Sequence, residues 1–353
     1  MHLDMKSPSK RRIRRRFVVA GSTLAAAAAV IAGAAAVPAS ATQHGSTKGP
    51  GYPPPGGIYA PFTDCPLTNP LMEESMTGGD GMGCVAGDAN NGTFTIGSLV
   101  VEVAHPVTAQ FGLWDPPGAS PSQFTGGILP PADGKELVVS PEFVPGGMLK
   151  ALGCPSSNPD VEKLCRAATL PGETTVVKAL VQSAGPITNF AVTTWTQPVK
   201  IRLINPLLGS ACYIGSDDNP IVLNPSITGT LGITPDPNPT RFPNTAVLSV
   251  TGATATDDTF SVPVATGCGL GGAANIAIDL AIDSSDGLPS ASGNNSLVLN
   301  GNFYLADNFS GSNNAHILLA AFRASHGVPP VTGRTARSVD GSARGHFGIK
   351  GRP

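Results

Sequence analysis

The sequence predicts a mainly β protein with an antiparallel, sandwich-like fold and a short helical insert. Gly and Pro are abundant, with 43 and 34 residues among 353, whereas aromatic residues make up 5% and charged residues 13%. Short apolar runs are separated by turn signals such as DPPGASP, LPPADG and TPDPNP. In VKIRLI, Val199, Ile201 and Leu203 alternate with Lys200 and Arg202, which is the period of a half-buried strand.

Ten segments carry a strand pattern, and they are residues 93–104, 107–114, 135–143, 174–182, 187–195, 199–205, 226–233, 245–252, 259–265 and 296–307. Residues 146–153 and 158–168 are the clearest helical segments. Residues 273–287 leave both structures open. Ile276, Ile278, Leu280 and Ile282 alternate as in a strand, whereas Gly287 is suited to end a helix.

The first 41 residues have the pattern of a signal peptide. A basic segment at residues 6–16 precedes an Ala-rich apolar stretch, and Ala39-Ser40-Ala41 fits the small-x-small cleavage rule. The segment RRRF at residues 14–17 leaves both Sec and twin-arginine export open. We therefore expect a secreted protein, extracellular or associated with the cell wall, and no membrane span after cleavage.

Composition divides the remaining chain into three parts. We predict a Pro/Gly-rich disordered linker at residues 42–61 and a β-sandwich region at residues 62–325. That region is long enough for one large module or two small ones, with a boundary at residues 145–170 in the second case. A basic, disordered tail follows at residues 326–353.

Charge separates the predicted body from its tail. Without the signal peptide the net charge is −8, and residues 42–322 alone carry −13. An acidic body disfavours nucleic acid as a partner. The basic tail is the part that we expect to bind a cell-wall or surface polymer.

The cysteines predict structural disulfides. They are Cys65, Cys84, Cys154, Cys165, Cys212 and Cys268. An even number is typical of an oxidising compartment, and C-x-x-C and His clusters that would suggest a metal site are absent. The spacing favours Cys65–Cys84 and Cys154–Cys165, which leaves Cys212 with Cys268.

The segment GCGLGG, residues 267–272, fits the G-x-G-x-x-G spacing of a dinucleotide-binding loop, and Asp286 lies where a ribose-binding carboxylate is sought. Because Cys268 lies inside it and no repeated βαβ pattern surrounds it, we interpret it as a corner fixed by a disulfide. We predict no cofactor.

Catalytic motifs are scarce. G-x-S-x-G and H-E-x-x-H are absent, and we assign no catalytic residue. The adjacent carboxylates at 73–74, 217–218 and 257–258 are typical of turns rather than of a glycosidase pair. If the protein is a hydrolase with a dispersed acidic site, the candidate residues are Asp217, Asp218, His105 and Asp258.

Residues 78–93, GGDGMGCVAGDANNGT, are expected to form a flexible loop tied by Cys65–Cys84. Asp80, Asp88 and Asn90 among the glycines make it a weak calcium candidate, because the spacing is not that of an EF-hand. We assign no metal site on this basis.

The segments ACYIGSDDNPIVLNPSITGT and GCGLGG…DGLPSASGNNSLVLNG carry a resemblance. Over residues 190–305 the chain resembles a family of secreted actinobacterial, Streptomyces-like proteins, which pair C-Y-I-G-S with a later G-C-G and G-L-P-S-A-x-G-N-N. The resemblance implies secretion and supports the Cys212–Cys268 bridge, but it implies no activity.

Two functions fit the sequence. The first is a non-enzymatic extracellular or envelope-associated protein that adheres to a surface or binds a ligand, and the second is the dispersed hydrolase. The lack of motifs favours the first, although fold class alone does not decide function.

Overall fold

The computed structural model describes residues 56–72, 81–115, 126–169, 175–243, 245–271, 274–307 and 315–328. The predicted signal peptide lies outside the described residues, as do most of the predicted linker and tail. All described residues belong to one compact unit formed by residues 41–353.

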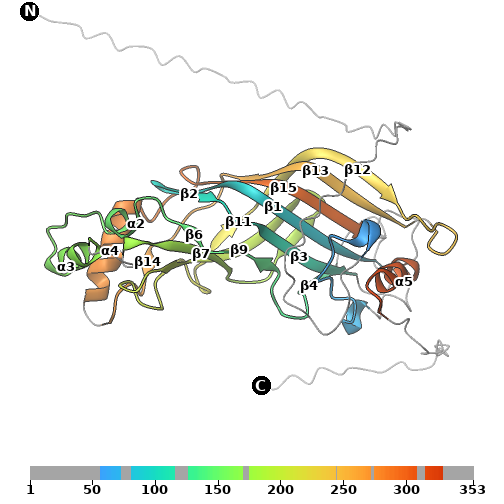
Figure 1. Ribbon diagram of the computed structural model, residues 1–353, viewed down its shortest axis with the longest axis horizontal. Coiled ribbons are helices and arrows are strands. Elements are labelled where there is room, and N and C mark those ends of the chain that lie inside the picture. Colours follow the sequence, from blue (N-terminus) through green and yellow to red (C-terminus); the bar gives the residue numbers. More distant parts are fainter. Residues whose placement is uncertain are drawn as a thin grey trace, which may run out of the picture. The chain divides into compact units, whose positions relative to one another are not determined.

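The fold is mainly antiparallel β, as the sequence predicts (Figure 1). The strands are β1 (Met82–Ile96), β2 (Leu99–Val103), β3 (Val107–Trp114), β4 (Gly127–Leu129), β5 (Leu137–Val138), β6 (Glu142–Phe143), β7 (Lys178–Ser183), β8 (Thr188–Ala191), β9 (Thr194–Ile204), β10 (Tyr213–Ile214), β11 (Ile221–Leu223), β12 (Ser226–Pro235), β13 (Ala246–Asp257), β14 (Ala265–Thr266) and β15 (Ser296–Asp307). Two of them, β3 and β15, have the predicted bounds. The predicted strand 259–265 is reduced to an isolated bridge between Val262 and Ser290 and to the short β14.

The strands form one sheet in the order β14-β10-β9-β12-β13-β15-β1-β3-β4, with β7 and β11 also paired to β9. Strands from before and after residues 145–170 are therefore neighbours in the same sheet. Strand β9 takes part in both halves: Thr194 at its start pairs with β12, whereas its later residues pair with β7. Side chains from both halves meet in one apolar cluster, so the halves face each other across it.

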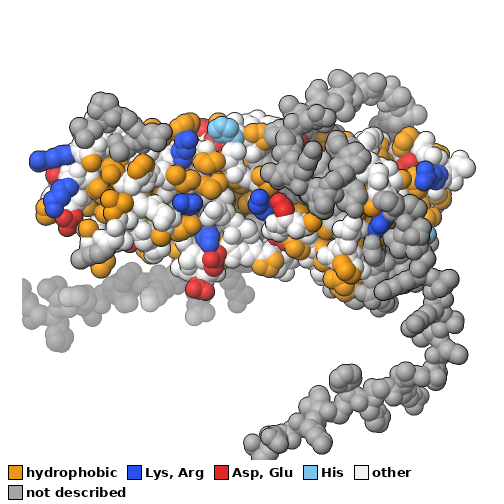
Figure 2. Space-filling model, turned by 60° about the horizontal axis from the view of Figure 1, so that its bottom comes forward, with side chains coloured by type: hydrophobic (Ala, Val, Ile, Leu, Met, Phe, Trp, Pro, Cys, Tyr) orange, Lys and Arg blue, Asp and Glu red, His pale blue; other side chains and the backbone are white. Residues whose placement is uncertain are grey.

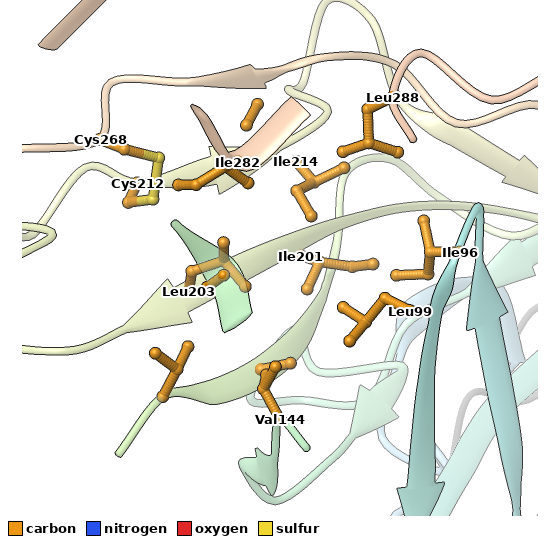
Figure 3. Packing of buried hydrophobic residues seen from close by; sticks show 14 of the residues in the cluster. Ile96, Leu99, Val144, Ile201, Leu203, Cys212, Ile214, Cys268, Ile282 and Leu288 are labelled. Carbon is orange, nitrogen blue, oxygen red and sulfur yellow. A yellow bond between two sulfur atoms is a disulfide. The ribbon is translucent and has the colours of Figure 1, made fainter. Parts of the chain in front are cut away.

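A large apolar cluster lies between the two halves (Figure 3). Ile96 and Leu99 enter it from the β1–β2 hairpin, and Ile201 enters it from β9. In β9 the buried residues alternate with half-buried ones, as the period of VKIRLI predicts. Burial of one face of each half is the main source of stability of such a sandwich.

The helices include both predicted ones, α2 (Gly147–Ala151) and α3 (Pro159–Ala168). The N-cap residue of α3 is Asn158, whose side chain accepts hydrogen bonds from the amides of Asp160 and Val161. This cap and Pro159 at the first turn explain why the helix begins at this residue.

Residues 274–286, which the sequence left open, form helix α4 (Ala274–Asp286). Ile276 and Leu280 are exposed while Ile278 and Ile282 are buried, so the burial follows a helical face. The helix ends where Gly287 adopts a φ of 71° and the Leu288 amide donates to the Asp283 carbonyl at 2.7 Å. This is the bonding of a Schellman cap, which the glycine permits.

The second face of the sheet around β1, β3 and β15 is covered by the one-turn 3₁₀ helix η1 (Gly57–Tyr59) and by α5 (Ala315–Ser325), which the sequence did not reveal. Tyr59 is 3% exposed and lies 4.7 Å from Phe322 between ring centroids. The residues of η1 were assigned to the predicted linker at 42–61. Likewise His326, the first residue of the predicted tail, is buried and bonds the carbonyl of Phe62 at 2.8 Å. The packed region therefore extends beyond both predicted boundaries, because aromatic residues near each end find partners on this face.

Strand β1 corrects the prediction of a flexible loop at residues 78–93. Residues 82–96 form a strand that pairs with β15 on one side and β3 on the other. Strand glycines and a bulge between Ala89 and Asn91 hid this strand from a search for alternating apolar residues.

All three predicted disulfides are present. Cys65 bonds Cys84, Cys154 bonds Cys165, and Cys212 bonds Cys268. The second joins α3 to the turn after α2, which confirms the stapled helical insert. The third lies in the apolar cluster beside Ile282 of α4 (Figure 3).

Candidate functional site

A cavity of about 150 Å³ lies between the two halves of the sheet. Its walls are almost entirely aliphatic or aromatic. One wall comes from β1, β2, β3, β13 and β15, and the facing wall from β7, β9 and β11. A hollow of this size with apolar walls has room for an apolar guest such as benzene.

The first wall is hollow because its inward-facing residues are small. Gly87 of β1 lies opposite Ala109 of β3, and both line the cavity. Ala89 of β1 lies opposite Gly301 of β15, which in turn lies opposite Ala253 of β13. Small residues thus occupy two successive inward levels of four adjacent strands, Gly87 with Ala109 at the first and Ala89 with Gly301 and Ala253 at the second. The volume that larger side chains would fill in a sandwich core is left open.

Two β-bulges occur at the level of Ala89, Gly301 and Ala253. The register shifts between Ala89 and Asn91 in β1 and between Val250 and Ala253 in β13. Bulges bend a sheet and increase its twist. A Cβ atom on Gly301, between them, would overlap with the carbonyl oxygen of Asp88. Only glycine allows this close approach of β15 to β1, so Gly301 shapes the wall as well as lining it.

The facing wall is built from branched side chains of two neighbouring strands. Val181 of β7 lies opposite Ile201 of β9, and Val199 lies one inward position earlier on β9. The same inward row of β9 contains Gln197 and Trp195. Gln197 is only 4% exposed, which makes it a polar side chain in an apolar lining.

The segment that contains β5 and β6 runs from one half to the other, because β5 pairs with β3 and β6 pairs with β7. Glu142 of β6 lines the cavity but is fully engaged. One of its oxygens accepts the amides of Ala104 and His105 at 3.0 and 2.7 Å, and the other contacts His105 Nδ1 at 3.0 Å. Its role is to hold the β2–β3 turn against β6.

The glycine loop at residues 267–271 is filled by the chain's own groups. The amides of Gly267 and Cys268 donate to the Asp279 carboxylate at 3.2 and 2.8 Å. The Gly269 amide donates to the Leu208 carbonyl, and the Gly271 amide to the side chain of Asn275. The donors that a nucleotide phosphate would need are thus bonded within the protein.

Asp286 has no access to a ribose either, because it is 2% exposed at the end of α4. Its Oδ1 atom has no hydrogen-bond partner in the described ranges. The pKa of this carboxyl is raised to about 6, mainly by burial. This value includes a smaller lowering by the positive charge of Lys150 and a smaller raising by the negative charge of Asp283. The same burial effect raises the pKa of Asp283. These carboxyls belong to the packing of α4 against the sheet.

The candidate residues for hydrolysis are not brought together. Asp217 and Asp218 lie in the turn between β10 and β11, Asp258 follows β13, and His105 lies between β2 and β3. Asp217 forms an ion pair with Lys200 at 2.7 Å. No hydrogen bond or ion pair joins any two of these four residues. Within the described ranges no three His, Cys, Asp or Glu residues form a metal-binding group.

The calcium candidates do not form a loop. Asp88 lies within β1. Its Oδ1 accepts two hydrogen bonds from Asn302, one from the backbone amide at 2.9 Å and one from the side-chain Nδ2 at 3.1 Å. Asn90 lies at the bulge of the same strand. Asp80 lies outside the described residues, as do the carboxylates at 73–74.

On the face shown in Figure 2, charged side chains are scattered among polar and apolar ones, without a broad patch of one sign. None of the helices in the described part of the chain combines the length and hydrophobicity needed to cross a membrane. The predicted binding tail from residue 329 onward lies outside the described residues. Polymer binding by the tail therefore stays a prediction.

Sequence reasoning missed the cavity because its signal is dispersed. Gly87 and Ala89 fell in the supposed loop, and Gln197 lay between two predicted strands. The signal that could have found the site is the small-residue alternation G-x-A at 87–89 and A-x-A at 253–255 in strands.

Comparisons with protein-family models, with curated proteins and with solved structures find no match for this chain. The resemblance to secreted actinobacterial proteins stays a prediction, and the site is interpreted from its geometry.

Proposed function

We propose that the protein is an exported, non-enzymatic binding protein that holds a small apolar molecule in the cavity between its two β layers. The observation that carries the proposal is the cavity itself. Its wall depends on small residues at two successive levels of four strands, with two bulges and a glycine that no other residue can replace without moving β1.

Energetics support a bound guest. Space left unfilled beside the apolar walls forfeits the van der Waals contacts that larger side chains would make there. Larger apolar residues at Gly87 or Ala109 would recover some of these contacts. A ligand that fills the space would restore packing contacts by binding the folded state. The volume is below the usual range for drug-sized ligands, so the guest is a small molecule.

The three disulfides support the export part of the proposal, because such bonds persist in oxidising compartments. Expression of the full chain in an actinobacterial host tests it. Mass spectrometry of protein from the culture fluid should find Thr42 at the N-terminus. An intact N-terminus with the protein retained in the cytoplasm would contradict export.

Toluene is a suitable probe of the cavity, and calorimetry and thermal unfolding measure its binding. Binding to the native state should raise the unfolding free energy by about 2.7 kcal/mol when toluene is present at about 100 times its dissociation constant. Gly87→Leu should abolish this binding. A Cβ atom at Gly87 meets no atom closer than 4.0 Å, and its φ lies outside the left-handed region, so the new side chain would occupy the cavity.

Gly127→Leu is the matched control. Gly127 is also a strand glycine, its nearest neighbour to a new Cβ is 3.9 Å away, and it does not line the cavity. It should bind toluene like the unaltered protein. The proposal fails if the unaltered protein binds no toluene, or if Gly87→Leu, shown to be folded by circular dichroism, binds it equally well.

A further inference from the structure

Gln197 is the polar residue of the cavity whose hydrogen bonding is incomplete. It occupies an inward position of β9, between Trp195 and Val199, and is 4% exposed. Burial of an amide among apolar groups is unfavourable unless both of its ends are bonded. Leu or Val at this position would make the wall apolar throughout, so the amide distinguishes this part of the lining.

The orientation of the amide is fixed by its neighbours. Its nitrogen donates to the carbonyl of Pro198 at 3.2 Å and contacts Ser183 Oγ at 3.4 Å. Because a carbonyl oxygen can only accept, the nitrogen and not the oxygen must lie on that side. Oε1 is left on the other side, and it accepts no hydrogen bond from any residue that the structure describes.

The two carboxylates and the other amide of the lining are engaged elsewhere. Both oxygens of Glu142 bond the β2–β3 turn. Asp88 of β1 lies opposite Asn302 of β15, and the Asn302 side chain donates a hydrogen bond to Asp88. Both side chains lie on the sheet face opposite to that of Val85 and Phe303. Gln197 thus supplies a free acceptor to an otherwise apolar space.

We infer that the cavity selects a small apolar molecule bearing one hydroxyl group, which donates a hydrogen bond to Gln197 Oε1. This inference rests on the proposed function and adds the chemical class of the ligand. A neutral hydroxyl meets the acceptor without bringing a charge into the cavity, whereas a carboxylate would place two acceptors against Oε1. The remaining surface of the guest is apolar, to match the walls.

Phenol and toluene test the inference, because they have the same shape and differ by a hydroxyl in place of a methyl group. Their dissociation constants are measured by calorimetry with the unaltered full chain and with Gln197→Met, which conserves side-chain length. Loss of the acceptor should weaken phenol binding roughly tenfold, the worth of one buried hydrogen bond, and change toluene binding less than about threefold. Comparing the two ligands in both proteins cancels their different hydration.

Gln197→Leu serves as a second variant if Gln197→Met does not fold, and it should give the same difference between the ligands. An equal change for phenol and toluene overturns the inference, since Gln197 would then act only on packing. Toluene binding without any phenol binding to the unaltered protein also overturns it but leaves the proposed function intact. Binding of neither ligand refutes the proposed function itself.

Discussion

Asp286→Asn should stabilise the protein at neutral pH and leave its stability unchanged in acid. The carboxyl is buried at the C-terminal end of α4, and one of its oxygens has no partner in the described part of the chain. Burial raises its pKa from 3.8 to about 6. A raised pKa means that the folded state favours the protonated carboxyl, so ionisation works against folding.

The pH window follows from these two values. Below about pH 3 the carboxyl is protonated in both states and the penalty is absent. The penalty grows as the pH rises from the unfolded value of 3.8 to the folded value of about 6, and is constant above that. A shift of this size corresponds to about 3 kcal/mol, with the attraction of Lys150 already included. Asparagine has the same shape and does not ionise.

Urea unfolding of both proteins at about pH 3 and about pH 8 measures the effect. The gain in unfolding free energy should be near zero at the lower pH and reach about 2–3 kcal/mol at the higher pH. Asp218→Asn, in the exposed turn between β10 and β11, is the control and should change stability by less than about 0.5 kcal/mol. A gain of equal size at both pH values would refute the reasoning, because the effect would then come from packing and not from ionisation.

Three further predictions concern the framework. Cys212→Ser, measured by urea unfolding, should cost about 4 kcal/mol, because the bridge closes a loop with a sequence separation of 56; an unchanged midpoint would argue against that linkage. Asp279→Ala should cost about 2–3 kcal/mol by leaving the amides of Gly267 and Cys268 unpaired, and hydrogen exchange should show faster exchange at both; unchanged protection would contradict the role assigned to Asp279. His326→Ala should lower the thermal midpoint by removing contacts to the carbonyls of Phe62 and Phe322, and a midpoint equal to that of the unaltered protein would show that these contacts are dispensable.

Local patterns were sufficient for much of the framework. The strands β3 and β15 have the predicted bounds, and the helix after Asn158 begins at its cap. Such elements depend on the period of apolar residues and on turn chemistry, both of which are read within a few residues. The three disulfides followed from spacing, since two pairs each close a short loop and leave the third.

Helix α4 shows the limit of local patterns. Its isoleucines and leucine alternate with period two, yet Ile276 and Leu280 are exposed. The decision between strand and helix came from tertiary contacts: Asp279 bonds the glycine loop and Asp283 bonds the Ala265 amide. These partners lie 11 and 18 residues away, and the alternation of apolar residues within the segment carries no information about them.

Strand β1 was missed for a related reason. Its glycines and its bulge weaken the alternation that identifies a strand, while its two neighbours, β3 and β15, supply the hydrogen bonds that hold it. The supposed calcium loop was a consequence of that omission, because the oxygen of Asp88 is used by Asn302 across the strands.

The sequence by itself determined the β class, the three disulfides, the stapled helices and the absence of known catalytic motifs. Only the tertiary structure decided where the cavity lies and what lines it. Ala89, Ala253 and Gly301 come from three different strands, and the register of the sheet places them at one level, next to that of Gly87. A residue's small size marks a cavity only when its neighbours in space are small as well, and those neighbours are set by strand pairing rather than by sequence distance.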